Sequence, residues 1–77
     1  MNSNFEKAFG NRIRTLRETA GMTQELLSVQ MQINGCDITR SAVAKIEVGQ
    51  RHIYPDEIKL IKEILKVSYN DLFDDLD

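Results

Sequence analysis

Apolar residues recur along this 77-residue chain every three or four positions. This spacing places them on one side of a helix, whereas a strand would require alternation. In the first twenty residues, the predicted apolar face consists of Phe5, Ala8, Phe9, Ile13, Leu16 and Ala20. The same spacing returns near the end, at Ile58, Ile61, Ile64 and Leu65. Because no segment alternates convincingly, we predict an all-α fold.

Capping residues predict where the first two helices begin and end. Ser3 and Glu6 have the S-x-x-E spacing of a capping box, so we expect the first helix to begin at Ser3. Gly21 is expected to end it in the left-handed conformation. Thr23 is then the expected N-cap of a second helix, from Gln24 to about Gln32.

Similar signals predict three further helices, which gives five short helices with short connections. After a turn at Asn34-Gly35, the third helix is expected to have its N-cap at Thr39 and its end at Gly49. The fourth is expected to have Pro55 at its first position, and the last, over 69–73, to have its N-cap at Ser68.

The predicted third helix has two different faces. At 100° per residue, Ala42, Val43 and Ile46 share one narrow face. The opposite face carries Arg40, Ser41, Ala44, Lys45 and Val48. A helix of about ten residues is too short to be stable alone in water, so neighbouring elements must hold it. Its outward face suits the major groove of DNA, where arginine, serine and lysine can bond to base edges.

Charge is unevenly distributed along the chain. The net charge is −2, but residues 1–53 carry +2 and residues 54–77 carry −4. The acidic total argues against non-specific binding to polyanions. It leaves room for a basic surface on the first two thirds of the chain.

The chain contains the stretches "RIRTLRETAGMTQELLSVQM" and "ITRSAVAKIEVGQR", followed by the closing "LKVSYNDLF". These stretches resemble the phage-repressor and Cro type of helix-turn-helix domain, the XRE family. The resemblance extends over about residues 5 to 73. It implies a compact five-helix, lambda-repressor-like fold and sequence-specific binding of double-stranded DNA. It also implies a bacterial or phage transcriptional regulator with helix 39–48 in the major groove.

The resemblance implies a role for individual residues as well. Base contacts are implied for Thr39, Arg40, Ser41 and Lys45. Phosphate contacts are implied for Gln24, which also braces the recognition helix, and for Gln50 and Arg51 after Gly49. A structural ion pair is implied for Arg17 and Glu47.

One departure from the family pattern lies between the two helices of the motif. The chain is about five residues longer than usual there, within "QINGCD" at residues 32–37. The extra residues are expected either to extend the second helix or to form a loop that reaches the DNA backbone. The tilt of the third helix is open on this basis.

Few residues suggest chemistry other than binding. Cys36 and His52 have no second ligand nearby in sequence, so we expect no metal, no cofactor and no enzymatic activity. A single cysteine, no secretory signal and no long apolar run lead us to expect a cytoplasmic protein without a membrane span.

The expected working unit is a homodimer on a pseudo-palindromic site, because one short helix reads few base pairs. Its contact is expected to involve the fourth helix, including Leu60, the segment Val67 to Phe73, or both. Residues 1–77 are expected to be one domain with a frayed end at 74–77. Two alternatives stay open at this point. One is the antitoxin of a toxin–antitoxin pair, and the other is an interaction module that kept the fold without binding DNA.

Overall fold

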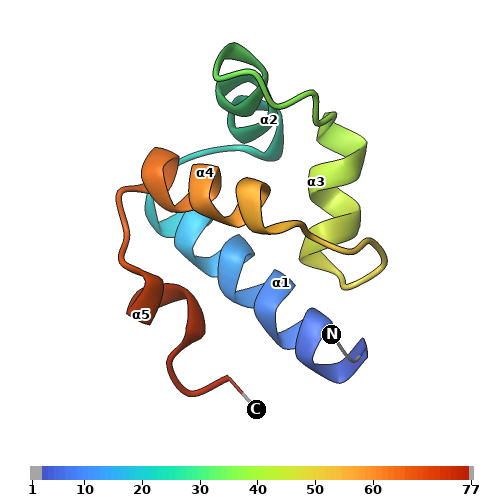
Figure 1. Cartoon of the computed structure of the whole chain (residues 1–77), viewed down its shortest axis with the longest axis vertical. Helices are drawn as coiled ribbons and strands as arrows, with labels where there is room; N and C mark the ends of the chain where they lie inside the picture. The colour runs from blue at the N-terminus through green and yellow to red at the C-terminus, as the bar shows by residue number, and fades with distance from the viewer. Residues whose placement is uncertain (1–2, 77) are drawn as a thin grey trace.

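A computed structural model describes residues 3–76 of the chain, which form five helices. They are α1 (Ser3–Thr19), α2 (Gln24–Ile33), α3 (Arg40–Glu47), α4 (Pro55–Leu65) and α5 (Tyr69–Phe73). Helix α3 packs against α1 and α2, α4 packs against α2, and α5 packs against α1 (Figure 1). Residues 3–76 contain no strand, so the predicted all-α fold is confirmed.

Side-chain caps define the helices of the central motif as expected. The Thr23 hydroxyl accepts a hydrogen bond from the Leu26 N–H at 3.0 Å, and the Thr39 hydroxyl accepts one from the Ala42 N–H at 3.1 Å. Each cap satisfies one of the amides that a helix start leaves without an internal partner. Gly49 has a φ of 77°, and the next amide, that of Gln50, donates back to the Lys45 carbonyl. This left-handed ending directs the chain away from α3.

The predicted start of the first helix is confirmed, because α1 begins at Ser3. The Glu6 carboxylate, which was expected to cap this start, contacts the His52 ring, from the loop after α3. Ala20 is exposed, because the helix ends at Thr19 before Ala20 can join its apolar face.

The core contains side chains from all five helices and from the loop before α3. Phe9 stacks on Phe73 of α5 with 4.8 Å between ring centroids, and Phe5 continues the stack at 6.4 Å from Phe9. The most deeply buried apolar residues are Phe9, Ile13, Leu27, Met31, Ile38, Val43, Ile46, Ile61, Leu65 and Leu72.

The chain end folds back toward α1. Arg12 donates hydrogen bonds of 2.8 Å to the carbonyl oxygens of Asp71 and Asp74. A guanidinium at the end of a helix satisfies carbonyls that have no partner within the helix. Residues 74–76 thus continue as a turn, and residue 77 lies outside the described residues.

The long connection between α2 and α3 both extends the helix and forms an anchored loop. Helix α2 continues through Ile33, and Gly35 then turns the chain with a φ of 87°. Ile38 is only 1% exposed, and its carbonyl accepts a 2.8 Å hydrogen bond from the Gln32 amide. The loop therefore returns into the core directly before α3 begins.

Candidate nucleic-acid interface

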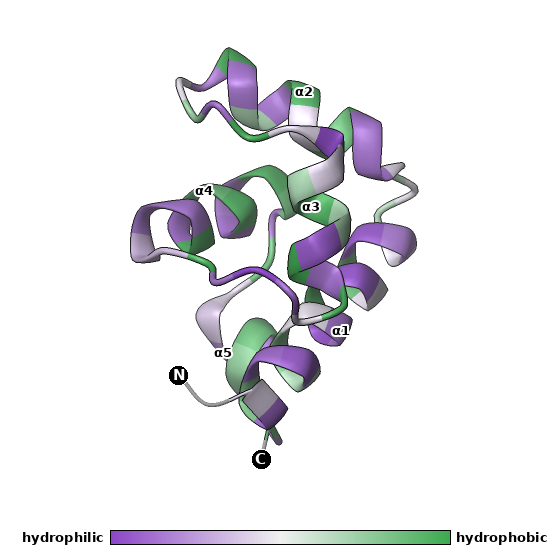
Figure 2. Ribbon diagram, turned by 90° about the vertical axis from the view of Figure 1, so that its right-hand side faces the viewer, coloured by the Kyte–Doolittle hydropathy of each residue, from purple (hydrophilic) through white to green (hydrophobic). Residues whose placement is uncertain are grey.

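Helix α3 is held by one face and exposes the other. Val43, Ile46 and Glu47 are 2–3% exposed, whereas Arg40, Ser41 and Lys45 are exposed. Figure 2 looks onto this side of the molecule, with α3 in front, α1 beside it and α2 above. The cations on α3 therefore contribute to a surface and not to the core, as the helical wheel predicts.

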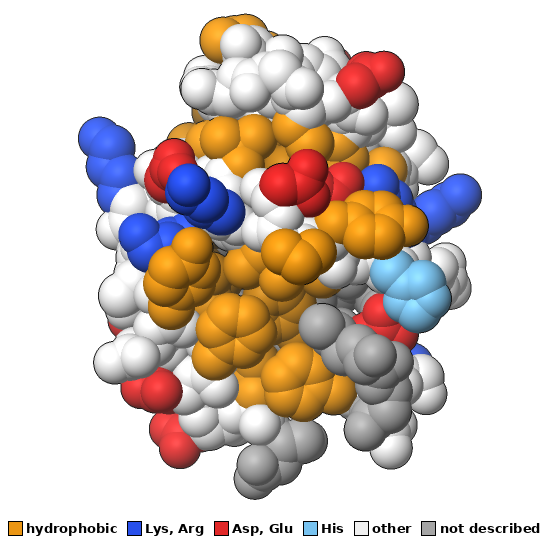
Figure 3. Space-filling model, in the orientation of Figure 1, with side chains coloured by type: hydrophobic (Ala, Val, Ile, Leu, Met, Phe, Trp, Pro, Cys, Tyr) orange, Lys and Arg blue, Asp and Glu red, His pale blue; other side chains and the backbone are white. Residues whose placement is uncertain are grey.

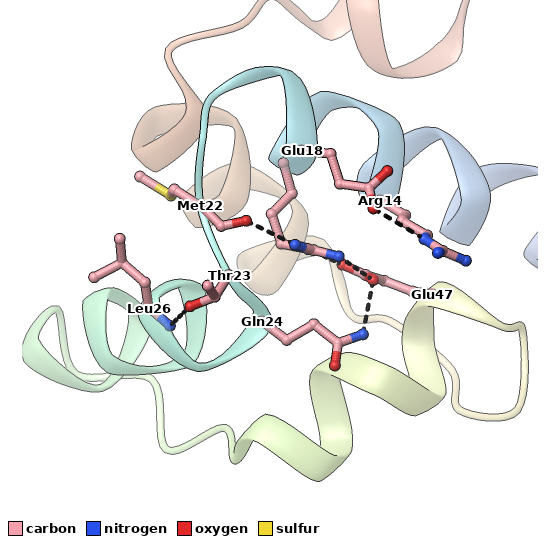
Figure 4. A network of polar contacts seen from close by, with 8 residues as sticks. Arg14, Glu18, Met22, Thr23, Gln24, Leu26 and Glu47 are labelled. Atoms are coloured by element: carbon pink, nitrogen blue, oxygen red, sulfur yellow. Dashed lines mark hydrogen bonds and ion pairs between the residues drawn. The ribbon is translucent and has the colours of Figure 1, made fainter.

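A network around the Glu47 carboxylate fixes the position of α3. The Arg17 Nε donates to Glu47 Oε2 at 2.7 Å, and Arg17 Nη2 donates to Oε1 at 3.0 Å. The Gln24 amide donates to the same Oε1 at 3.0 Å (Figure 4). The carboxylate thus joins one side chain from α1 and one from α2 to the last turn of α3.

Both charged side chains of this network are buried, so protein groups must supply their hydrogen bonds. The Arg17 and Glu47 side chains are 8% and 0% exposed, so neither charge is solvated. Hydrogen bonding to Glu47 raises the pKa of Arg17, although burial acts in the opposite direction. A third hydrogen bond, from Arg17 Nη1 to the Met22 carbonyl at 2.7 Å, satisfies more of the guanidinium. Two buried charges are tolerable here because each is paired and hydrogen-bonded.

An open hollow of about 550 Å³ adjoins this network. It lies where the end of α1, the start of α2 and the start of α3 meet. Its lining residues are Arg14, Arg17, Thr23, Gln24, Glu25 and Arg40. The amides in the first turn of α2 carry a partial positive charge, which favours an anion nearby.

The segment after α3 differs from the sequence prediction in one respect. Gln50 is exposed, as a phosphate contact requires. The Arg51 guanidinium instead makes two 3.0 Å hydrogen bonds to the Glu57 carboxylate and one of 2.8 Å to the His52 carbonyl. Its pKa is raised by the bond to Glu57. Both terminal nitrogens of Arg51 thus have protein partners that sequence reasoning missed.

The helix-turn-helix family matches residues 13–72, most of the chain. The chain belongs to the helix-turn-helix family. It is also 33% identical over 75 residues to Control protein C.BamHI of Bacillus amyloliquefaciens. The aligned region covers 96% of this chain and 86% of the relative. No solved structure matches the chain significantly.

Membership of the helix-turn-helix family confirms three expectations. The fold is of the expected type, the chain is a helix-turn-helix DNA-binding domain, and this family is not enzymatic. Within the helix-turn-helix domain, α2 and α3 form the motif and α3 is its second helix.

The helix-turn-helix domain also contains a close backbone contact that sequence reasoning missed. Gly10 of α1 lies against α3, where a Cβ atom would be 2.1 Å from the Ile46 carbonyl oxygen. A glycine inside a helical pattern was the available signal, since it often marks such an approach.

None of the helices within residues 3–76 has the length and apolar character needed to cross a membrane. Over the same residues, no three His, Cys, Asp or Glu side chains gather as metal ligands would.

Proposed function

We propose that this protein is a sequence-specific regulator of transcription that binds double-stranded DNA with α3 in the major groove. The observation that carries the proposal is the separation of the two faces of α3. Val43, Ile46 and Glu47 are locked inside, so the helix presents Arg40, Ser41 and Lys45 on a fixed surface. The helix-turn-helix family and the name of the relative, a control protein, support the same role.

Base reading is assigned to the start of α3. Arg40 can donate two hydrogen bonds to a guanine, and Lys45, one turn later, can reach a guanine or a phosphate. Ser41 can donate or accept. The Thr39 hydroxyl oxygen accepts the cap bond from Ala42, which leaves its hydrogen and its second lone pair for a base contact.

Phosphate binding is assigned to both sides of α3. At one side, Gln24 and the free amides of the first turn of α2 face the hollow that Arg40 also lines. One N–H of the Gln24 amide is committed to Glu47, which leaves the other for a phosphate. At the other side, Gln50 is exposed, and Arg51 can add positive potential while it remains bound to Glu57.

The test is selection of bound duplexes from a random pool, followed by affinity measurements on the selected duplex. Arg40→Ala is expected to cost about 1–3 kcal/mol of specific binding if Arg40 contacts a base in two places. Its melting temperature is expected to change little, because Arg40 is exposed. Lys59→Ala removes an exposed cation on α4 and serves as the control. Unchanged affinity of Arg40→Ala for the selected duplex would overturn the placement of α3.

The working unit is proposed to be a homodimer that forms through the exposed aromatic side chains of α5. Tyr69 and Phe73 of α5 are 47% and 37% exposed. Figure 3 shows hydrophobic side chains gathered over the face on which α4 and α5 lie. Analytical ultracentrifugation with the selected duplex is expected to give two chains per site. One chain per site, with no symmetry in the selected sequence, would refute the dimer.

A further inference from the structure

Helix α1 lies so close to α3 that its exposed side borders the outward face of α3. The contact is made at Gly10, where a Cβ atom would be 2.1 Å from the Ile46 carbonyl oxygen and 3.0 Å from the Glu47 carbonyl carbon. The two helices are packed against each other and are neighbours in Figures 1 and 2.

Three polar residues follow one another along the exposed side of α1. Lys7, Asn11 and Arg14 are separated by four and three positions, so they lie on one face of the helix. All three are exposed. We call these three residues the α1 strip.

The two cations of the α1 strip lie at opposite ends of α3. Lys7 packs over the end of α3, because a Cβ atom on Gly49 would be 2.6 Å from the Lys7 Cγ. Arg14 lines the same hollow as Arg40, at the start of α3. The rise of a helix places Lys7 and Arg14 about 10 Å apart along α1, so the two cations can serve different phosphates.

We propose that the α1 strip is a further DNA contact, which binds the sugar–phosphate backbone along one edge of the groove that α3 enters. This inference rests on the proposed function, since it requires α3 to occupy a groove. When a helix enters the major groove, elements that border it meet the phosphates of the groove wall. Lys7 and Arg14 supply the charge, and the Asn11 amide between them supplies a neutral donor.

Nearby carboxylates do not cancel the charge of the α1 strip. Glu18 is 3.5 Å from the Arg14 Nε, but both side chains are 55% exposed, and exposed pairs of this kind are weak. Glu25, in the first turn of α2, is exposed and lines the hollow, and within residues 3–76 it makes no ion pair with Arg14. Glu6, the carboxylate beside Lys7 in sequence, contacts His52. A phosphate can therefore replace the single weak partner of Arg14.

The salt dependence of DNA binding tests the proposal. The probe is the duplex selected from a random pool, and a scrambled duplex of equal length measures sequence dependence. Lys7→Gln and Arg14→Gln are each expected to reduce the slope of log K against log salt by about 1. Each loss of affinity is then about 3.5-fold larger at 50 mM than at 200 mM salt. The loss is expected to be equal on both duplexes, because phosphates carry no sequence.

Lys59→Gln is the matched control, because it removes an exposed cation of α4 that lines a different hollow, with Asn34 and Glu63. It should leave the slope unchanged. Asn11→Lys is the complementary variant, and it is expected to increase the slope by about 1. A gain of binding cannot be produced by a misfolded chain.

The outcomes distinguish this inference from the proposed function. In one outcome, Arg40→Ala loses specific binding, but the three α1 variants behave like Lys59→Gln. The DNA contact of the α1 strip is then refuted, while the proposed role of α3 stands. If Arg40→Ala binds the selected duplex like the unaltered chain, the proposed function fails first. Slopes that change in the three α1 variants alone establish the backbone contact.

Discussion

Removal of the Glu47 carboxylate will leave the Arg17 guanidinium buried without its counterion. The two side chains are 0% and 8% exposed and share two hydrogen bonds, of 2.7 Å and 3.0 Å. Breaking a buried pair from one side typically costs about 3–5 kcal/mol, because the remaining charge stays unsolvated. We therefore expect Glu47→Leu to lose about this much stability. In a domain of this size, the melting temperature then falls by at least about 12 °C.

The double variant Arg17→Met/Glu47→Leu is the informative comparison. It removes both charges and fills the space with apolar atoms, so it should be more stable than Glu47→Leu alone. Gln24 loses its bond to Glu47, but it is only partly buried and can turn to water. Urea unfolding of the two single variants and the double variant, followed by circular dichroism, gives the coupling energy. Effects that add to within about 0.5 kcal/mol would refute the reasoning, because independent sites behave in this way.

Two further predictions concern stability. Gly10→Ala forces a methyl group against the Ile46 carbonyl, so it is expected to lower the unfolding free energy from a urea melt by about 1–3 kcal/mol. Asn11→Ala, beside it on the exposed side of α1, should lower it far less. Equal unfolding free energies of the two variants would contradict the close contact. Burial opposes ionisation of Glu57, but hydrogen bonds from Arg51 and from the Tyr54 amide outweigh it and lower the pKa of Glu57 below its ordinary value of 4.5. A lowered pKa in the folded state stabilises the fold above that ordinary value and ceases to do so as pH falls through the folded value. Unfolding free energy measured from pH 6 to pH 3 should therefore fall less in Glu57→Gln than in the unaltered chain, and parallel curves would contradict this assignment.

Local chemistry explains which parts of the fold the sequence predicts well. Thr23, Thr39 and Ser68 cap helices by accepting a hydrogen bond from the residue three positions ahead, so their neighbours suffice to identify them. The two faces of α3 follow from helical periodicity in the same way. Local sequence also predicts the start of the first helix at Ser3. It contains no information about the contact that Glu6 makes with His52, 46 positions away.

The contacts that the sequence did not predict join residues from different elements. Arg12 holds the end of α5, and Gly10 admits the backbone of α3. A glycine inside a helical pattern signals a close approach, but the sequence does not identify the element that makes it. Arg51 illustrates the limit for the candidate site. Its position after Gly49 suggested a phosphate contact, and only the folded chain shows that Glu57 occupies its guanidinium. A side chain that is charged and close to an interface can be structural.

The division of labour on α3 has a consequence for how binding preferences can change. The residues that hold the helix, Val43, Ile46 and Glu47, are different from those that face outward, Arg40, Ser41 and Lys45. An exchange of the outward residues leaves the core, the Glu47 network and the capping bond of Thr39 intact. Substitutions on the outward face of α3 can therefore change the DNA sequence that is preferred, while the stability of the fold and the orientation of α3 stay the same.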